Sequence, residues 1–470
     1  MGIPVCSGCR TRDARIAELE GQLAELQRRV AELEARLGTN STNSSVPPSA
    51  NPLGAPKPGT KKKSKRKPGG QPGHPPRLKQ WLPPERVHQT VTFVPTQCAH
   101  CQAPLPPEPS PADPAPTRFQ TIELPPVVAI VTEYQGQART CPCCGEVTRP
   151  PIPRDILAHS VGPRLTATLS YLTGCHGVSK RGVEEMAAVV FDAPVALGTV
   201  ANLEQEVSAA LAAPHQEAVA AVQTAAVKHA DETSWKRRGQ LCWLWAAATT
   251  TVAAFLIHAK RSAAGLTALL GAEIQGILCS DRWGVYDRVP AARRQLCWAH
   301  LKRDFQKIVD SGGPSVFVGR RGRLLVKKVF AAWHAFQEGQ VTRAQLKEQM
   351  APLKNRMQRL LLEGALLGED PKVATFCENL LALEPALWTF VEVEGVEPTN
   401  NFLERLLRRA VLWRKRSFGS WSDAGCRFVE RILTVVQTRR LQDKNVLDYV
   451  HEALVAHRSG QPCPKLLPEG

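Results

Sequence analysis

The sequence predicts an α/β protein, in which a β-sheet is preceded and followed by helices. Five short runs between residues 225 and 309 have the length and the β-branched, aromatic and apolar character of strands: AAVKHA, QLCWLWAAATT, TVAAFLIHA, IQGILCS and RQLCW. Helical patterns occupy the segments 156–213, about 320–390 and 399–442 instead. No run of 18 apolar residues occurs, so the sequence excludes a membrane-spanning helix.

Charge and cysteine content narrow the class of protein. The 470 residues include 60 Lys and Arg against 43 Asp and Glu, a formal net charge of +17, which favours a polyanionic partner. The N-terminus has no apolar signal core. Of the 14 cysteines, Cys242, Cys279 and Cys297 stand singly in apolar stretches, as reduced thiols do. A cytoplasmic protein is therefore expected.

Residues 1–38 are predicted to form a coiled-coil, leucine-zipper-like helix. Its apolar residues follow an unbroken a/d spacing: Ile16, Leu19, Leu23, Leu26, Val30, Leu33 and Leu37. In a parallel dimer, Arg15 would pair with Glu20, and Arg29 with Glu34, between chains. The alternative is one amphipathic helix packed on its own protein. We expect a homodimer or a higher oligomer.

Residues 39–80 are predicted to form a flexible linker, first rich in Pro and Ser and then basic. Its basic run comprises Lys61, Lys62, Lys63, Lys65, Arg66 and Lys67. The interpretation we favour is an arm that follows the DNA phosphate backbone. The alternative is a solubilising linker.

Residues 81–155 are predicted to form a zinc-binding module. Two Cys-x-x-Cys pairs, each able to hold one side of a tetrahedral Zn²⁺ site, are Cys98 with Cys101 and Cys141 with Cys144. Flanking runs, VHQTVTFV and VVAIVTEYQGQAR, resemble short strands. Cys143 competes with Cys144 and His100 with Cys101 as a ligand, and four ordinary thiols are the alternative. Cys6 and Cys9 form a third pair without an obvious mate in the chain.

Residues 156–215 are predicted to be helical. Three candidate helices read GPRLTATLSYLTGC, SKRGVEEMAAVVF and LGTVANLEQEVSAAL, and Ser179 can cap the second. The short turn between the second and third resembles a helix-turn-helix DNA-binding region. A plain helical hairpin is the alternative.

Three carboxylates are candidates for a metal site. Asp231 and Asp281 each follow an apolar strand, and residues just past strand ends converge on one crevice. Glu404 shares a helix strip with Asn400 and Arg408. Carboxylates held together repel unless a cation lies between them, and such oxygen ligands suit Mg²⁺. Alternatively, Asp231 caps a helix and Glu404 forms a surface salt bridge.

The chain resembles the transposases of the insertion-sequence-66 family, bacterial enzymes of the DDE type. The resemblance rests on eight motifs in family order. They are the leucine-rich helix, NSSVPPS, RKPGGQPGH, the two cysteine pairs, HADETSW with GQLCWLWAA, SDRWGVY, CWAHLKRDF and TNNFLERLLRRAVLWRKRSFGS.

The resemblance implies an RNase H-like core with a mixed β-sheet. Its first part would be residues 216–310 and its final catalytic helix region 396–445, with a helical insertion at 311–395 and a C-terminal tail at 446–470. The DDE triad falls on Asp231, Asp281 and Glu404, which would hold two Mg²⁺, or Mn²⁺, ions. The zinc module and the helices at 156–215 would recognise terminal inverted repeats.

Two further motifs carry implied roles. Cys297-Trp-Ala-His300 resembles a Cys-x-x-His motif of several DDE groups, in which His300 would orient the scissile phosphate or a flanking base; a buried capping histidine is the alternative. The family's RKN motif reads Arg414-Lys415-Arg416 here, so Asn is replaced. The basic residues expected to contact DNA from this region are Arg405, Arg408, Arg414 and Lys415.

The function implied is DNA transposition. The chain would bind the terminal repeats of an insertion element, cleave a strand and join it to target DNA. Its partners would be double-stranded DNA and small accessory proteins of the same element, with no membrane, in the bacterial cytoplasm at the nucleoid. A catalytically silent, zinc-containing DNA-binding protein derived from a transposase is the alternative, and a stand-alone nuclease is a second.

Overall fold

The computed structural model describes residues 7–37, 81–108 and 110–468. The chain divides into two units, Met1–Pro56 with Ala129–Gly470 and Lys57–Val128. The basic run at 61–67 and Cys6 lie outside the described residues, so the interpretations placed on them stay predictions.

A five-stranded mixed sheet forms the centre of the larger unit. Its strands are β3 (Val227–Arg237), β4 (Gln240–Ala248), β5 (Ala253–His258), β6 (Ile277–Ser280) and β7 (Arg294–Leu296), in the spatial order β5-β4-β3-β6-β7. Strands β3, β4 and β5 are antiparallel, whereas β6 and β7 run parallel to β3. All five strands predicted from the sequence are confirmed.

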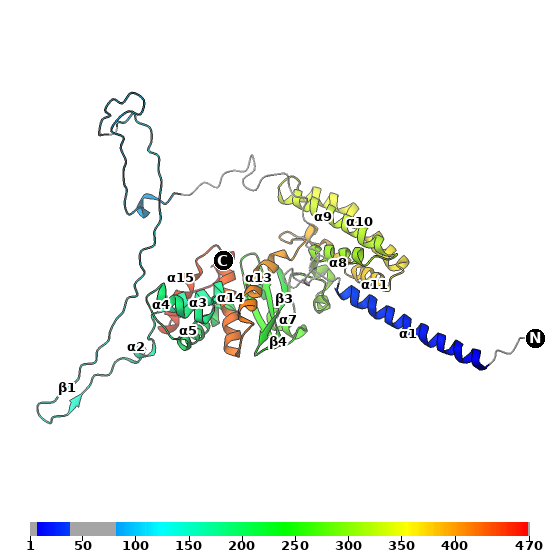
Figure 1. The fold of residues 1–470 in the computed structure, drawn as a ribbon, viewed down its shortest axis with the longest axis horizontal. Helices are drawn as coiled ribbons and strands as arrows, with labels where there is room; N and C mark the ends of the chain where they lie inside the picture. The colour runs from blue at the N-terminus through cyan, green and yellow to red at the C-terminus, as the bar shows by residue number, and fades with distance from the viewer. Residues whose placement is uncertain (1–6, 38–80, 109, 469–470) are drawn as a thin grey trace, which may run out of the picture. The chain divides into compact units, whose positions relative to one another are not determined.

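The two faces of the sheet are covered by different helices because side chains alternate along each strand. One face packs Trp235 and Leu244 against α13 (Asn401–Ser417) and α14 (Asp423–Leu441). The other face packs Ala230 and Trp245 against α6 (Ala212–Thr224) and α7 (Ala263–Leu270). Figure 1 shows α13 and α14 alongside the strands. Successive residues of β3 therefore face different helices.

Helices before the sheet form where the sequence predicts them. After α2 (Arg154–Ala158) come α3 (Pro163–His176), α4 (Lys180–Val189) and α5 (Leu197–Ala210). Ser179 caps α4 as expected, because its hydroxyl accepts a hydrogen bond from the Gly182 backbone N–H.

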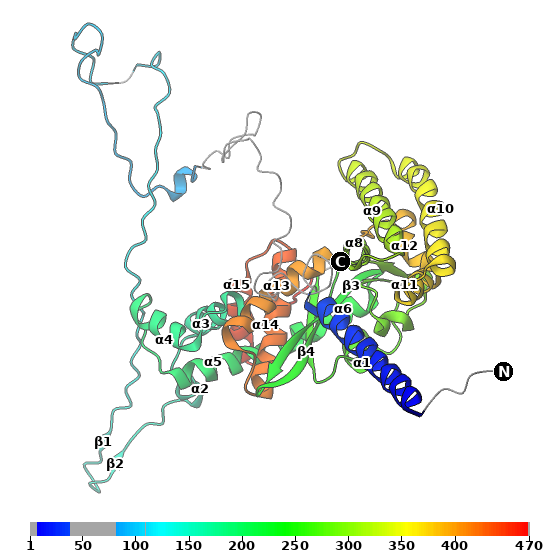
Figure 2. The same ribbon diagram turned by 45° about the vertical axis from the view of Figure 1, so that its right-hand side comes forward.

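Five helices form a second core beside the sheet, on the other side from α3, α4 and α5 (Figure 2). They are α8 (Trp298–Ser311), α9 (Val316–Gln337), α10 (Arg343–Leu367), α11 (Pro371–Ala382) and α12 (Glu384–Glu392). Thr342 and Gln345 begin α10 with a reciprocal capping box. The helical pattern at about 320–390 is confirmed, whereas the division of the chain into domains stays a prediction.

The last helical stretch is not continuous, which corrects one expectation. Phe418 has a left-handed backbone (φ 58°) and ends α13, and α14 begins at Asp423. The break lets Ser420 pair with the β3–β4 turn, since its N–H donates to the Lys236 carbonyl at 2.8 Å. Gly419 (φ 106°) must be a glycine here, because a Cβ would lie 2.2 Å from that carbonyl oxygen.

Residues 446–470 are not a simple tail, which corrects a second expectation. They contain α15 (Val446–Arg458), whose Tyr449, Val450 and Leu454 are buried. The helix contacts α3 and α5, and Leu466 beyond it is also buried. The C-terminal region thus completes the core around the helices that precede the sheet.

Strands predicted beside the cysteine pairs do not form, which corrects a third expectation. The runs at 87–94 and 127–139 lack strand structure apart from Arg139, which begins β1, and Phe93 and Ile130 are 90% and 96% exposed. The strands present are β1 (Arg139–Thr140) and β2 (Val147–Thr148), which pair with each other. Among the residues that the structure describes, neither predicted run has a neighbouring strand that could accept its backbone hydrogen bonds.

The N-terminal helix, α1 (Ser7–Leu37), exposes its apolar seam. Ile16 and Leu26 are 52% and 59% exposed. Arg15 bonds to Glu18 of the same helix at 2.6 Å. An exposed seam does not test whether two chains pair here, so the coiled coil stays a prediction. None of the helices described is long and apolar enough to cross a membrane.

Candidate active site

Asp231 lies inside β3, not after its end as the sequence indicated, and pairs with Ala246 of β4. Asp281 directly follows β6, as predicted. The parallel register joins Val227 to Ile277 and His229 to Cys279. Asp281 lies two residues beyond the last of these pairs, directly after β6, and its negative charge acts on Asp231. The two carboxylates therefore come from adjacent points of the sheet.

The electrostatic surroundings of Asp231 are unfavourable to its charge. Burial raises its pKa well above the usual range, and the negative charges of Glu232, Asp281 and Glu404 raise it further. A hydrogen bond from the Glu232 backbone N–H to Oδ1, at 2.9 Å, opposes this rise. Glu404, distant in sequence, thus lies near enough to act on Asp231.

Burial also raises the pKa of Asp281, but more groups stabilise its charge. The Trp283 backbone N–H donates to its Oδ1 at 2.9 Å, and the cationic side chains of Arg261, Arg294 and Arg282 lower its pKa. Arg294 is fully buried and donates to the Asp281 backbone carbonyl at 3.2 Å. Asp281 is the better stabilised of the two aspartates.

Glu232 faces the side of the sheet opposite to α13. Its side chain is 2% exposed and accepts hydrogen bonds from Arg261 Nε and the Tyr286 hydroxyl, both at 2.8 Å. Arg261 in turn stacks over Trp243 and Trp283. Glu232 is therefore part of a packed polar network.

Glu404 is positioned by Asn400, the residue before α13. The buried Asn400 side chain donates from Nδ2 to the Ala230 carbonyl at 2.9 Å and accepts from His229 Nδ1 at 2.8 Å. Both partners belong to β3, next to Asp231. The sequence analysis placed Asn400 on the same helix strip as Glu404 but missed this anchoring role. The feature of the sequence that indicated it is the position of Asn400, four residues before Glu404.

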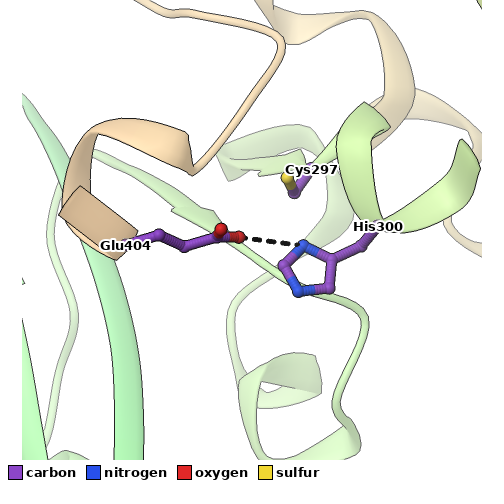
Figure 3. Close-up of side chains that lie close together, drawn as sticks. All are labelled: Cys297, His300 and Glu404. Carbon is purple, nitrogen blue, oxygen red and sulfur yellow. Dashed lines mark ion pairs between the residues drawn. The ribbon is translucent and has the colours of Figure 1, made fainter. Parts of the chain in front are cut away.

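Glu404 meets Cys297 and His300 of the α8 start, and their ligand atoms all lie within 4.8 Å of one another (Figure 3). Figure 3 shows the carboxylate pointing at the imidazole ring, with Oε1 and Nδ1 3.6 Å apart. In the described part of the chain, this is the group of three potential metal ligands that meets that distance; Asp231 and Asp281 are not in it.

Two atoms of this group lack hydrogen-bond partners. His300 Nδ1 and Glu404 Oε1 are buried without a hydrogen-bond partner, and Oε1 lies 3.6 Å from both His300 Nδ1 and Arg303 Nη2. Burial lowers the pKa of His300 to about 3, so its imidazole is neutral at pH 7. Burial raises the pKa of Cys297 to about 11.

Basic residues of α13 divide into two kinds. Arg405, Arg408 and Lys415 are exposed. Arg414 turns inward instead, where its Nη1 donates to the Ser234 backbone carbonyl, the Ser234 hydroxyl and the Thr233 hydroxyl. Three of the four α13 residues predicted to contact DNA thus have free access to solvent, while the fourth ties α13 to β3.

An aromatic pair beside this helix was missed by sequence reasoning. Phe418 and Trp421, at the α13–α14 break, are 76% and 78% exposed. They flank Ser420, which is bonded to Lys236 and Arg238 of the β3–β4 turn. Exposed aromatic rings next to cationic side chains suit stacking on nucleic-acid bases. The signal in the sequence was the aromatic residues that follow the basic run Arg414–Arg416.

Both cysteine pairs adopt the same loop. The Gln102 N–H donates to the Cys98 carbonyl and the Gly145 N–H to the Cys141 carbonyl, each at 2.9 Å, and Gln102 and Gly145 are left-handed. Backbone N–H groups two and three residues on lower the pKa of Cys98 and Cys141. These are loops suited to a bound metal; the two pairs belong to different units, so their common Zn²⁺ stays a prediction.

Comparisons with known proteins agree with this arrangement. A family model described as "Transposase IS66 family" matches residues 159–427, which is more than half of the chain. A second, described as a family of unknown function (DUF6444), matches residues 6–79. A protein of Sinorhizobium fredii described as the uncharacterized protein y4qI is 25% identical over 214 residues, which are 42% of this chain and 38% of that protein.

Proposed function

The chain belongs to the transposase IS66 family, and on this premise we propose that it is a transposase that cuts and joins DNA at the ends of an insertion element. The observation that supports the proposal is that Asp231 and Asp281 come from the neighbouring strands β3 and β6, while Glu404 on α13 lies near enough for its charge to act on Asp231. Because the chain spans about 38% of the length of the relative it matches, nothing is transferred from that relative.

We propose that the core is RNase H-like. The mixed sheet with order β5-β4-β3-β6-β7, an antiparallel hairpin followed by parallel strands, supports this. The long helical segment from α9 to α12 would be an insertion before the final catalytic helix, α13. In open α/β sheets, binding sites form in the crevice at the carboxyl ends of the strands, and Asp281 lies at such an end, directly after β6.

The carboxylates of Asp231, Asp281 and Glu404 would hold a divalent cation of the Mg²⁺ or Mn²⁺ type. Their oxygen donors are the ligands these ions prefer, and burial with mutual repulsion raises the pKa of Asp231, which a cation would relieve. When bound, two such ions supply activation of the attacking oxygen and stabilisation of the leaving oxygen.

The surrounding residues would hold this geometry. Asn400 fixes the start of α13 to β3, and thereby the height of Glu404 over Asp231. Arg294, buried and bonded to the Asp281 carbonyl, fixes the turn after β6. The neutral imidazole of His300 would orient a phosphate oxygen or a flanking base of the DNA end.

DNA would be held by exposed cations. Arg405, Arg408 and Lys415 line α13, and the net charge of +17 favours binding to a polyanion. The run Lys61–Lys67 would add phosphate contacts. The Cys98 and Cys141 loops with one Zn²⁺, together with α3, α4 and α5, would recognise the terminal inverted repeats.

Two DNA ends must be brought together for transposition, and α1 would provide the contact between chains. Its exposed seam includes Leu19 and Leu23, which a parallel second copy would bury. Replacement of Leu23 by Asp should convert the dimer to a monomer in sedimentation analysis; an unchanged mass would assign dimerisation elsewhere. Small accessory proteins of the same element would complete the assembly.

The test is Mg²⁺-dependent strand transfer on a labelled duplex that carries the element's own end, with the accessory proteins added where they are encoded. Asp281→Asn should abolish both cleavage and joining, with end binding retained. Asp443→Asn is the matched control, since Asp443 is exposed and its left-handed backbone (φ 53°) tolerates Asn. Binding without cutting, by wild type and variant alike, would favour the silent DNA-binding protein.

A further inference from the structure

Cys297, His300 and Glu404 combine sulfur, nitrogen and oxygen ligand atoms at one point, within 4.8 Å of one another. Two elements bring them together: α8 supplies His300 in its first turn, after Cys297, and α13 supplies Glu404. The starts of these helices are tied by two hydrogen bonds, from Trp298 N–H to the Pro398 carbonyl at 2.9 Å and from Asn400 N–H to Cys297 Sγ at 3.2 Å.

Cys297 is the N-cap residue of α8, and backbone N–H groups lie near its sulfur as they do near the sulfurs of Cys98 and Cys141. The Asn400 N–H donates to the Cys297 Sγ at 3.2 Å, and the backbone N–H groups of Ala299 and His300 lie near enough to lower its pKa. These donors oppose the effect of burial, which still raises the pKa of the free thiol to about 11, and they would stabilise the thiolate that a bound metal requires. After each of the three cysteines, the residue three positions on can itself ligate a metal: Cys101, Cys144 and His300.

Two buried atoms of this group have no hydrogen-bond partner. His300 Nδ1 and Glu404 Oε1 are both buried without a hydrogen-bond partner, although they are 3.6 Å apart. Buried polar atoms are normally satisfied. A cation between them, held also by the nearby sulfur, would satisfy both.

The donor set identifies the class of ion. Mg²⁺ prefers oxygen ligands alone, whereas Zn²⁺ is bound by Cys, His and carboxylate, often three of them with one open position. We propose that Cys297, His300 and Glu404 form a second cation site that takes one ion of the Zn²⁺ class and, when occupied, withdraws Glu404 from Asp231 and Asp281. The inhibition that follows rests on the proposed transposase function; the binding does not.

Arg303 competes with a bound cation for Glu404, which lowers the expected affinity of this site for Zn²⁺. The Arg303 guanidinium is 3.6 Å from the same Oε1 and repels an approaching cation. Binding also releases the Cys297 thiol proton. Zn²⁺ should therefore fill the cysteine pairs at 98–101 and 141–144 first and this site at higher concentration.

The binding test uses the full chain with one equivalent of Zn²⁺ already bound, titrated with Co²⁺ in the absence of Mg²⁺ and DNA. Co²⁺ should add a thiolate-to-metal charge-transfer band in the near ultraviolet. Cys297→Ser should remove that band, while Cys377→Ser, at a buried cysteine of α11 outside the group, should retain it. A band that persists in Cys297→Ser would overturn the site, as would no band in the wild type.

A second variant guards against misfolding. His300→Ala leaves the thiol and its N–H donors in place, so it should weaken Co²⁺ binding at least about tenfold, which corresponds to about 1.4 kcal/mol, with an unchanged circular dichroism spectrum. Equal Co²⁺ affinity in folded wild type and His300→Ala would also refute the proposal.

Inhibition is measured separately. Added Zn²⁺ should suppress Mg²⁺-dependent strand cleavage by the wild type and by Cys377→Ser, and Cys297→Ser should need at least about tenfold more Zn²⁺. Equal sensitivity of the three proteins would contradict the withdrawal of Glu404. If no protein cleaves DNA while the Cys297-dependent cobalt band appears, the proposed transposase function fails and the second cation site stands.

Discussion

Asn400 accepts a hydrogen bond from His229 Nδ1 at 2.8 Å, which joins the residue before α13 to the central strand of the sheet. The same side chain donates to the Ala230 carbonyl at 2.9 Å. One buried amide therefore fixes the position of Glu404, one helical turn later, relative to Asp231, one residue later on β3. The geometry of the candidate triad depends on this amide.

Replacement of Asn400 by Ala should cost both stability and cleavage. It leaves His229 Nδ1 and the Ala230 carbonyl buried without partners, so the free energy of unfolding should fall by about 2–3 kcal/mol. Strand cleavage should fall at least about tenfold even at temperatures where the variant is folded. Denaturant unfolding and single-turnover cleavage measure the two effects.

The adjacent Asn401 provides the control, because its side chain is exposed. Asn401→Ala should leave the free energy of unfolding within about 0.5 kcal/mol of the wild type. If Asn400→Ala and Asn401→Ala behaved alike, the anchoring role of Asn400 would be wrong.

Arg408 and Arg414 should respond differently to replacement by Ala, although both lie on α13. Arg408 is exposed, so its loss should weaken DNA binding and reduce the salt-dependence slope by about 1. Arg414 donates to the Ser234 carbonyl, so its loss should lower the melting temperature instead. Fluorescence anisotropy across salt concentrations and thermal unfolding separate the two; an altered slope for Arg414→Ala alone would reverse the assignment.

Glu430 should make stability depend on pH. Burial raises its pKa to about 7 from the model-compound value of 4.5, against the Ile257 N–H that donates to it at 2.6 Å. Because the folded state holds the proton more tightly than the unfolded state, the carboxyl favours folding below pH 4.5. That contribution is lost as the pH rises to 7, by about 3 kcal/mol in total.

The comparison is between wild type and Glu430→Gln, whose amide oxygen can still accept from Ile257. The difference in free energy of unfolding, wild type minus variant, should fall from pH 5 to pH 8. Glu452→Gln, at an exposed position of α15, should show no such trend. If the difference in free energy of unfolding between wild type and Glu430→Gln did not change with pH, the pKa of the Glu430 carboxyl would not be raised.

We expect one Zn²⁺ ion to be bound jointly by the two cysteine pairs. Cys98→Ser and Cys141→Ser should each remove the same ion, so the double variant should lose no more zinc than either single variant. In the apo protein, trypsin should cleave at Arg118 and Arg139, which are exposed, and Zn²⁺ should protect these sites. Two ions lost independently would mean two separate sites.

The elements that the sequence predicted well are those whose cause is local. The five strands have continuous apolar or β-branched runs, and α3, α4 and α5 have helical spacing and a Ser179 cap. The position of Asp281 was predicted correctly because β6 ends in a local turn, in which the Asp281 side chain accepts a hydrogen bond from the Trp283 N–H. The position of Asp231 was not, because β3 continues past it to Arg237 as the partner of β4.

The break at Phe418 and the helix at 446–458 also escaped sequence reasoning. The first depends on Ser420 pairing with Lys236, nearly two hundred residues earlier. The second depends on α3 and α5, which give Tyr449 and Leu454 a surface to pack on. In both cases a distant partner satisfies the backbone or buries the side chain.

The sequence by itself determined the α/β class, the strands, the family resemblance and the three acids, since composition, spacing and motif order carry these. Only the tertiary structure decided which side chains share a site. In the structure, Asp231 lies inside β3 and Glu232 accepts a hydrogen bond from Arg261. Arg414 donates to the Ser234 carbonyl, and Glu404 lies beside His300 and Cys297. The physical reason is that strand register and helix docking fix side-chain neighbours through contacts between segments far apart in sequence.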